Sequence, residues 1–244
     1  MILALLAAAV LAAGVPRFGA APRPPAPAAA PAAAPVLAPA EVLARYATAL
    51  ASLREPRVFA FEYTLEQTGP RTLDQTHRVF RSGNDERDET LAVNGTRSLA
   101  PVVRVFRGRP YRYTVRALAP RPSAYDFTYA GPHRDGKHVD YVYRLVPKSG
   151  AHAIAFTSVT IDGITFLPHS VTFTAPGRGA GGSVTFGKAD RFWVARAADA
   201  QAKGRAGVAH ERLSFTNWRF PKSLPASTFA MPRPLPTLPA PPAG

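Results

Sequence analysis

Four side chains that can bind a metal ion lie close together in the sequence. His133 and His138, with Asp135 and Asp140, form a cluster of imidazole and carboxylate groups on a predicted turn and the strand after it. These groups are common ligands of divalent metal ions, so a metal site is one interpretation. Their spacing matches no zinc-binding motif, and a hydrated turn accounts for the same residues. We therefore predict no metal site.

Motifs for covalent and nucleotide chemistry are missing from the sequence. The chain has no cysteine, which excludes disulfides, thiolate metal sites, thiol catalysis and lipidation of an N-terminal cysteine. It contains no Gly-x-Ser-x-Gly elbow and no dinucleotide fingerprint. The glycines of Gly177–Gly182 lack the strand-to-helix setting and the Lys-Ser/Thr ending of a phosphate loop. The sequence therefore predicts that the protein is not an enzyme and carries no cofactor.

The charge of the chain favours anionic partners. Lys and Arg number 30 against 16 Asp and Glu, a formal net charge of +14. Such a charge attracts lipid headgroups or nucleic acid, although a solvated arginine-rich surface accounts for it equally. The basic residues are scattered, with no dense block and no recognisable nucleic-acid module. We predict no nucleic-acid partner and keep an anionic membrane surface as a candidate.

Both ends of the chain have compositions that cannot build a hydrophobic core. Residues 1–21 begin with the apolar run Met1–Val15, which is too short for an ordinary membrane span and typical of a signal peptide. An uncleaved anchor is the alternative. Residues 22–39 are a Pro/Ala-rich linker, and residues 232–244 are a Pro-rich disordered tail. We expect residues 40–231 to form one domain that is periplasmic or secreted, or tethered to the inner membrane by a retained leader.

The domain begins with an amphipathic helix and continues as strands. Apolar residues at helical spacing predict a helix over 40–53, ending before Pro56. From Arg57 the period changes to two, with Phe59, Phe61 and Tyr63 on one face. Further strands are predicted at 71–81, 85–93 and 101–107, with Asn94-Gly95 as a hairpin turn. Residues 111–118 fit a short helix or a strand equally.

His138–Ala175 predicts an antiparallel meander of three strands. Turns are expected at Lys148–Gly150 and, as a two-residue hairpin loop, at Asp162-Gly163. Strands at 183–187 and 191–195 follow a loose loop at 177–182, and residues 197–207 read as a mobile loop. The last strand, 208–220, switches its apolar parity after Phe215, which indicates a bulge.

About ten strands and one helix predict a mainly β (α+β) fold. Ten strands at about 4.8 Å spacing make a sheet roughly 48 Å across, whereas a helix of about 14 residues is only about 21 Å long. One helix cannot cover such a face. We therefore expect a curled antiparallel sheet, a half-open barrel with the helix on its concave face and an apolar concavity left for a ligand.

The order of these elements resembles the LolA/LolB/RseB-like superfamily of periplasmic lipoprotein carriers and sensors. The resemblance extends over Glu41–Pro232 and rests on YRLVPK followed by VTIDGITFLPHSVTF, and on the terminal FTNWRFPKSLPASTFAMPRP. These are structural signatures and not catalytic ones. In that family a half-open barrel accepts acyl chains, and an arginine after the first hairpin helps to hold the closed state. Arg87 matches that arginine, although acidic neighbours replace the apolar or aromatic one usual in the family.

The resemblance implies an exported, monomeric carrier or binder of a lipid, acylated protein or similar amphiphile. A sensor or interaction module of the RseB-like branch, which binds a partner protein, is the second hypothesis. A secreted hydrolase is the third, and it requires a nucleophile and a base that the fold brings together. The aromatic and apolar residues of the concave face are candidates both for core packing and for ligand lining: Tyr46, Leu50, Phe59, Phe61, Tyr63, Tyr141, Tyr143, Phe166 and Phe173.

Overall fold

The structure, a computed structural model, describes residues 36–108, 114–135, 138–149, 153–175, 177, 179–204 and 206–231. The predicted leader, most of the linker and the tail lie outside these residues. Helix α1 spans Pro39–Ser52, α2 spans Val115–Leu118, and a short 3-10 helix, η3, spans Ala226–Phe229. The strands are β1 (Val58–Thr68), β2 (Leu73–Ser82), β3 (Asp85–Val93), β4 (Thr96–Arg107), β5 (Tyr125–Asp135), β6 (His138–Pro147), β7 (Ala155–Ile161), β8 (Pro168–Ala175), β9 (Ala180–Ala189), β10 (Phe192–Gly204) and β11 (Gly207–Arg219).

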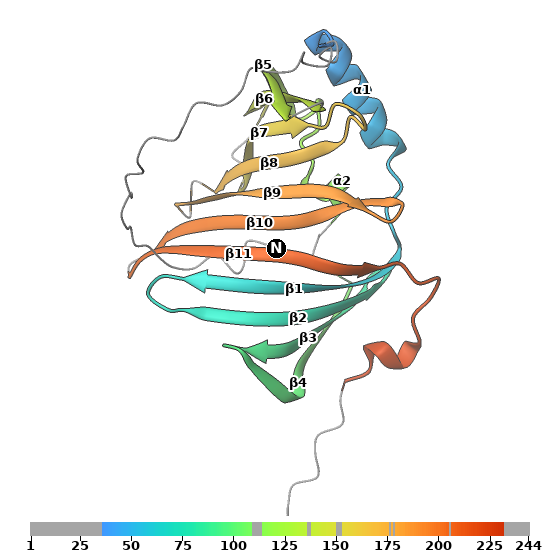
Figure 1. The fold of residues 1–244 in the computed structure, drawn as a ribbon, viewed down its shortest axis with the longest axis vertical. Helices are drawn as coiled ribbons and strands as arrows, with labels where there is room; N and C mark the ends of the chain where they lie inside the picture. The colour runs from blue at the N-terminus through green and yellow to red at the C-terminus, as the bar shows by residue number, and fades with distance from the viewer. Residues whose placement is uncertain are drawn as a thin grey trace, which may run out of the picture.

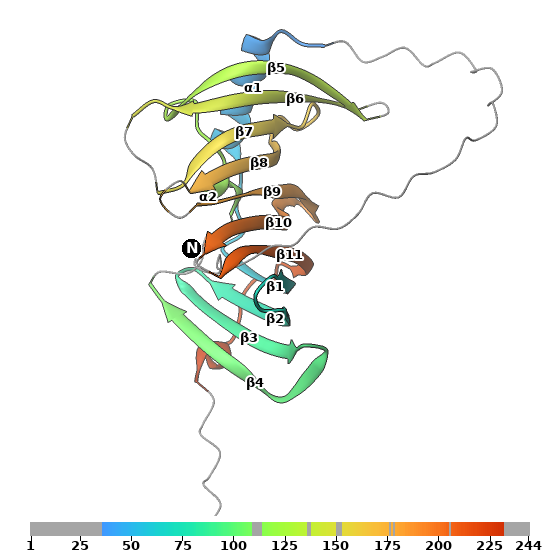
Figure 2. The same ribbon diagram turned by 90° about the vertical axis from the view of Figure 1, so that its left-hand side faces the viewer.

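All eleven strands form one antiparallel sheet, in the order β4-β3-β2-β1-β11-β10-β9-β8-β7-β6-β5. Figures 1 and 2 show the sheet curling between its two edges, β4 and β5. Among the described residues these edge strands do not pair with each other, so the barrel is open. The predicted mainly β fold with a half-open barrel is confirmed, with one strand more than expected.

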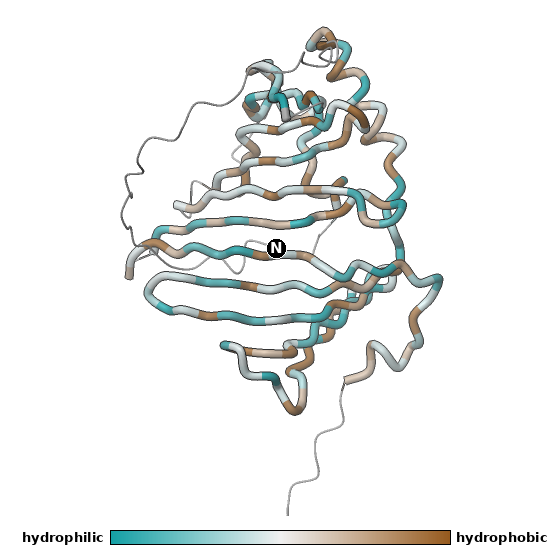
Figure 3. The backbone as a smooth tube through the Cα atoms, viewed as in Figure 1, coloured by the Kyte–Doolittle hydropathy of each residue, from teal (hydrophilic) through white to brown (hydrophobic). Residues whose placement is uncertain are grey.

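The sheet curls because one face of it is apolar. Polar and apolar residues alternate along the strands (Figure 3), as in the buried-exposed pattern of β1. The inward positions of β1, β6, β8 and β11 join a single hydrophobic core. Because the sheet curls, this apolar face lies on the concave side and is removed from water without a second sheet.

Helix α1 covers part of this inner face, as the sequence predicted. Val42 and Tyr46 are fully buried, and Leu43 and Leu50 pack against the core. Pro39 occupies the first turn, where a missing N–H costs no hydrogen bond, and Glu41 suits the helix dipole there. Figure 1 places α1 beside the ends of β5 to β8, so the helix sits at the mouth of the barrel.

The prediction of a mobile loop at residues 197–207 is wrong. These residues continue β10 to Gly204 and pair with β9 on one side and β11 on the other. Their alanine, lysine and glutamine residues have low intrinsic strand propensity, but two flanking strands supply hydrogen bonds and packing that override it. The loop predicted at 177–182 is also too long, because β9 begins at Ala180. Gly182 lies within β9, where an added Cβ would stand 2.9 Å from the Phe173 ring, so a side chain at this position would clash with it.

Two predicted turns differ in their outcome. At Asn94-Gly95 both residues have positive φ, 50° and 75°, as a two-residue hairpin requires. The loop at Asp162-Gly163 is longer than predicted and runs to Leu167. Asp162 Oδ1 accepts hydrogen bonds from the backbone N–H and the hydroxyl of Thr165, which folds the extra residues into an Asx-type turn.

Glu62 links three strands on the outer face of the sheet. Its Oε1 accepts hydrogen bonds from Arg78 on β2, at 3.0 and 2.8 Å, and its Oε2 accepts one from Asn217 on β11 at 2.7 Å. The bond from Asn217 is the main cause that holds the pKa of Glu62 below its ordinary value; burial opposes it, and Arg78 and Arg219 lower the pKa further. The carboxylate therefore stabilises the folded sheet.

This lowered pKa predicts a pH dependence of stability. A carboxyl group with a depressed folded pKa contributes stability above its unfolded pKa and loses it as the pH falls through the folded value. As the pH falls below about 4.5, the ordinary pKa of a glutamate, the unfolding free energy of the parent should fall. We expect it to fall less in Glu62→Gln. Urea denaturation from neutral to acidic pH measures this, with Glu66→Gln as an exposed control on the same strand. Identical profiles for parent and Glu62→Gln would contradict it.

Candidate functional site

Strand β1 carries three predicted lining residues on the concave face. Phe59, Phe61 and Tyr63 are each at most 5% exposed. The ring of Phe61 lies 6.0 Å from that of Phe59 and 5.8 Å from that of Phe215 on β11. Tilted aromatic pairs at these distances attract each other beyond the effect of burial. These side chains form a packed aromatic cluster on the concave face.

Trp218 completes the cluster and was not among the predicted residues. The register between β1 and β11 shifts at Ala60 and Glu62, where Asn217 adopts a φ of 52°. This bulge turns Trp218 inward, so that its ring stacks on Phe61 at 4.4 Å and lies 5.7 Å from Phe59. The parity switch in the sequence predicted the bulge correctly and was the signal that could have identified Trp218.

Three tyrosines fix α1 and the residues just before it, two through the sheet and one through the segment between α2 and β5. The Tyr141 hydroxyl accepts a hydrogen bond from the Leu37 backbone N–H, and the Tyr143 hydroxyl donates to the Pro39 carbonyl. The Tyr46 hydroxyl donates to the Pro120 carbonyl at 2.7 Å. Burial raises the pKa of Tyr143 to about 12 and raises the pKa of Tyr46 far above its ordinary value. Both hydroxyls therefore stay protonated as donors near neutral pH.

The other predicted lining residues are spread over the barrel. Phe173, on β8, is buried and lies over Gly182. Phe166 lies in the turn after β7, where the Arg45 guanidinium stands 5.0 Å from the centre of its ring. Leu50, on α1, lines a cavity of about 390 Å³ between α1 and the segment around α2.

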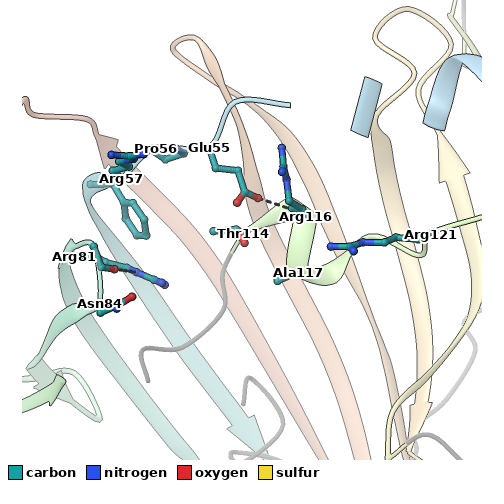
Figure 4. Close-up of a pocket in the computed structure, with 11 residues that line it drawn as sticks. Glu55, Pro56, Arg57, Arg81, Asn84, Thr114, Arg116, Ala117 and Arg121 are labelled. Atoms are coloured by element: carbon teal, nitrogen blue, oxygen red, sulfur yellow. Dashed lines mark hydrogen bonds between the residues drawn. The ribbon is translucent and has the colours of Figure 1, made fainter. Parts of the chain in front are cut away.

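A larger cleft opens where the link from α1 to β1, the turn from β2 to β3 and helix α2 meet (Figure 4). Its volume is about 750 Å³. Phe59 is the predicted lining residue that borders it. We call it the arginine cleft. The charged and aromatic residues of its wall are Glu55, Arg57, Phe59, Arg81, Arg116 and Arg121. Sequence reasoning missed the arginines because they are far apart along the chain.

A buried polar network lies beside the aromatic cluster. The Tyr63 and His77 rings stack at 4.5 Å with an interplanar angle of 7°. Asp88 accepts a hydrogen bond from the Tyr63 hydroxyl at 3.3 Å and contacts His77 Nδ1 at 2.8 Å, while His77 Nε2 lies 3.2 Å from Gln75 Oε1. Both ring nitrogens of His77 thus have partners, and the network links β1, β2 and β3.

Arg87 lies on the outer side of β3, between the inward-facing Glu86 and Asp88. It donates to Glu89 at 2.7 Å and to the carbonyls of Thr228 and Ala230 at 3.1 and 2.8 Å. Satisfying these carbonyls holds η3 against the sheet. The role in a closed state that the family resemblance implies for Arg87 stays a prediction.

Two histidines of the described residues contact carboxylates: His169 Nδ1 lies 2.7 Å from Asp140, and His77 Nδ1 lies 2.8 Å from Asp88. Within the same residues no group of three or more His, Asp or Glu side chains could hold a metal ion.

No helix in the described part of the chain is both long and apolar enough to cross a membrane.

Three solved structures have a similar fold. A LolA superfamily protein from Nitrosomonas europaea is 11% identical, with a TM-score of 0.44, over 80% of this chain and 99% of its own. A DUF1329 family protein from Desulfovibrio piger is 12% identical, with a TM-score of 0.46, over 78% and 97%. A putative outer membrane lipoprotein-sorting protein domain from Vibrio parahaemolyticus is 14% identical, with a TM-score of 0.43, over 77% and 95%. These likenesses carry no ligand, partner or role over to this chain.

No protein-family model matches the sequence, and no curated protein matches it.

Proposed function

We propose that this chain is an exported, monomeric binding or carrier protein for an amphiphile, such as a lipid or an acylated protein. One observation carries the proposal: the aromatic inner face of an open sheet runs without a break into the arginine cleft. Phe59 belongs to both, because it packs 5.7 Å from Trp218 and also borders the cleft. An acyl chain that enters there meets apolar surface continuous with the core.

The dimensions suit such a ligand. The cleft and the neighbouring cavity, about 750 and 390 Å³, share Arg116 and Arg121 in their walls, and small-molecule sites typically hold about 300–1,000 Å³. Since β4 and β5 are not paired with each other in the described sheet, the barrel can widen without breaking ladder hydrogen bonds.

The predicted lining residues have distinct places in this proposal. Leu50 and Phe59 already border a cavity. Widening would bring in the side chains that are now packed in the core or against it, namely Tyr46, Phe61, Tyr63, Tyr141, Tyr143, Phe166 and Phe173. Binding involves no covalent chemistry.

The chain contains only two tryptophans, which gives a direct test. Trp218, on β11, lies in the aromatic cluster that Phe59 joins to the cleft, whereas Trp193, on the neighbouring strand β10, donates to the Pro168 carbonyl at the start of β8. Titration with a medium-chain fatty acid should change the fluorescence of Trp193→Phe, which keeps Trp218. The response should be lost in Trp218→Phe. If neither the parent nor Trp193→Phe responds, and the purified chain carries no lipid by mass spectrometry, the proposal fails.

Binding of a partner protein is the second candidate, and the edge strand β4 favours it. Leu99 is fully exposed and Val102 is 59% exposed on this strand. An exposed edge with apolar side chains can pair with an extended segment of another chain.

Site-specific photo-cross-linking separates the two candidates. A cross-linker at position 99 should give adducts with protein if β4 binds a partner, and one at position 59 should then give none. The amphiphile proposal expects lipid adducts at position 59 and no reproducible adduct at position 99.

A further inference from the structure

We propose that the arginine cleft is an oxyanion site that binds the phosphate or carboxylate of the ligand headgroup, so that the ligand is an anionic amphiphile. This inference rests on the proposed function and adds the charge and the position of the headgroup. It starts from the composition of the cleft wall, which brings together four arginines and one glutamate for a formal net charge of +3.

Two of the arginines have unused binding capacity. The side chains of Arg57 and Arg121 are exposed, and among the described residues the structure shows no hydrogen bond or ion pair of either guanidinium. Each guanidinium carries five N–H donors in a planar fork that matches the oxygens of phosphate or carboxylate. Each of these side chains can therefore donate to a ligand oxygen without displacing a protein partner.

The other two arginines are positioned by the fold. Arg81 donates to the Gly83 carbonyl at 3.2 Å, stands 5.6 Å from the centre of the Phe59 ring, and lies 3.9 Å from the buried Glu86 carboxylate. Arg116 donates to the Leu53 carbonyl at 2.6 Å. Figure 4 shows the guanidinium groups of Arg81 and Arg121 projecting into the cleft from opposite walls. The cleft thus presents positive charge to its centre from two sides.

The carboxylates nearby only partly offset this charge. Glu55 accepts a hydrogen bond from the Arg116 backbone N–H at 2.8 Å, which turns its charge toward α2. Glu86 is fully buried behind Arg81 and is positioned to orient that guanidinium.

Apolar surface adjoins the arginines on both sides. Phe59 leads to the aromatic cluster, and the cavity that Arg116 and Arg121 share with the cleft is bordered by Ala47, Leu50 and Ala51. A molecule with its oxyanion between Arg81 and Arg121 can place an acyl chain against either surface. This pairing of a basic wall with an apolar floor suits an anionic amphiphile better than a free anion or a neutral lipid.

The test compares lysophosphatidylglycerol, the zwitterionic lysophosphatidylcholine, laurate, the neutral dodecyl maltoside and free glycerol 3-phosphate by calorimetric titration of the full chain. The variant is Arg57→Gln with Arg121→Gln, which removes no hydrogen bond or ion pair that the structure shows among the described residues. The matched control is Arg104→Gln with Arg144→Gln, two exposed arginines on β4 and β6. Circular dichroism and melting curves check that both variants fold.

We expect the parent to bind the two anionic amphiphiles more tightly than the other ligands. The cleft variant should lose about tenfold or more of that affinity, and the control variant should not. Equal binding of charged and uncharged amphiphiles by the parent and both variants would overturn the anion site while leaving the proposed function intact. A parent that binds no amphiphile would overturn both. Glycerol 3-phosphate binding as tightly as lysophosphatidylglycerol would identify a free-phosphate site and overturn the headgroup assignment.

Discussion

Replacing Phe61 by alanine is expected to lower the free energy of unfolding by about 3–5 kcal/mol. The ring is 1% exposed and packs against the rings of Phe59, Phe215 and Trp218. Its removal loses both the transfer free energy of the side chain and the contacts of neighbours that cannot close the space. Guanidinium denaturation with an unchanged m-value measures the difference.

Leu99→Ala is the matched control for Phe61→Ala. Leu99 is a large apolar residue in the same sheet, but it is fully exposed on the edge strand. Its truncation should change stability by no more than about 0.5 kcal/mol. A loss below about 1 kcal/mol for Phe61→Ala would mean that the aromatic cluster does not form part of the core.

Replacing Asp88 by alanine should cost about 2–3 kcal/mol. Asp88 and His77 are buried together, and the substitution leaves His77 Nδ1 without the acceptor that it contacts at 2.8 Å. It also removes the acceptor of one hydrogen bond from the Tyr63 hydroxyl. A buried polar group that loses its partner costs more than the hydrogen bond itself contributes.

Asp88→Asn separates this loss from a simple loss of packing. Asparagine keeps an acceptor oxygen at nearly the same volume, so we expect a smaller loss of unfolding free energy than for Asp88→Ala. Equal losses in the two variants would show that volume, and not the hydrogen bonds of the network, stabilises this part of the sheet.

Much of the fold could be predicted because local patterns and tertiary structure agree. The helix was expected at 40–53 and lies at Pro39–Ser52, since a proline start, an apolar stripe and a downstream proline all favour it. The strand from Val58 shows a strict period of two and is buried on one face. The second half of β10 had no such signal, because its strand structure comes from the neighbouring strands β9 and β11.

The candidate site was predicted only where it depends on strand periodicity. Phe59 and Phe61 face inward, as their alternation indicated, whereas Trp218 required a bulge whose consequence the sequence left open. Arg57 and Arg121 are 64 positions apart in the numbering, and the fold brings them to one cleft. A scattered distribution of basic residues along the chain therefore hid a concentrated one in space.

Burial also changes which variants can test binding. Tyr46 and Phe61 are almost completely buried, so aspartate at either position would unfold the domain before it could report on a ligand. Trp218 is only partly buried and borders the same cluster, which makes it the better reporter.

The most direct measurement is photo-cross-linking of the full chain with a fatty acid that carries a diazirine along its acyl chain, followed by peptide mapping. An acyl chain on the concave face should give adducts on the peptides that contain Phe59 and Trp218. An excess of unlabelled lysophosphatidylglycerol should suppress these adducts. Adducts confined to outward-facing peptides, or to the β4 edge around Leu99, would contradict binding of an amphiphile inside the barrel.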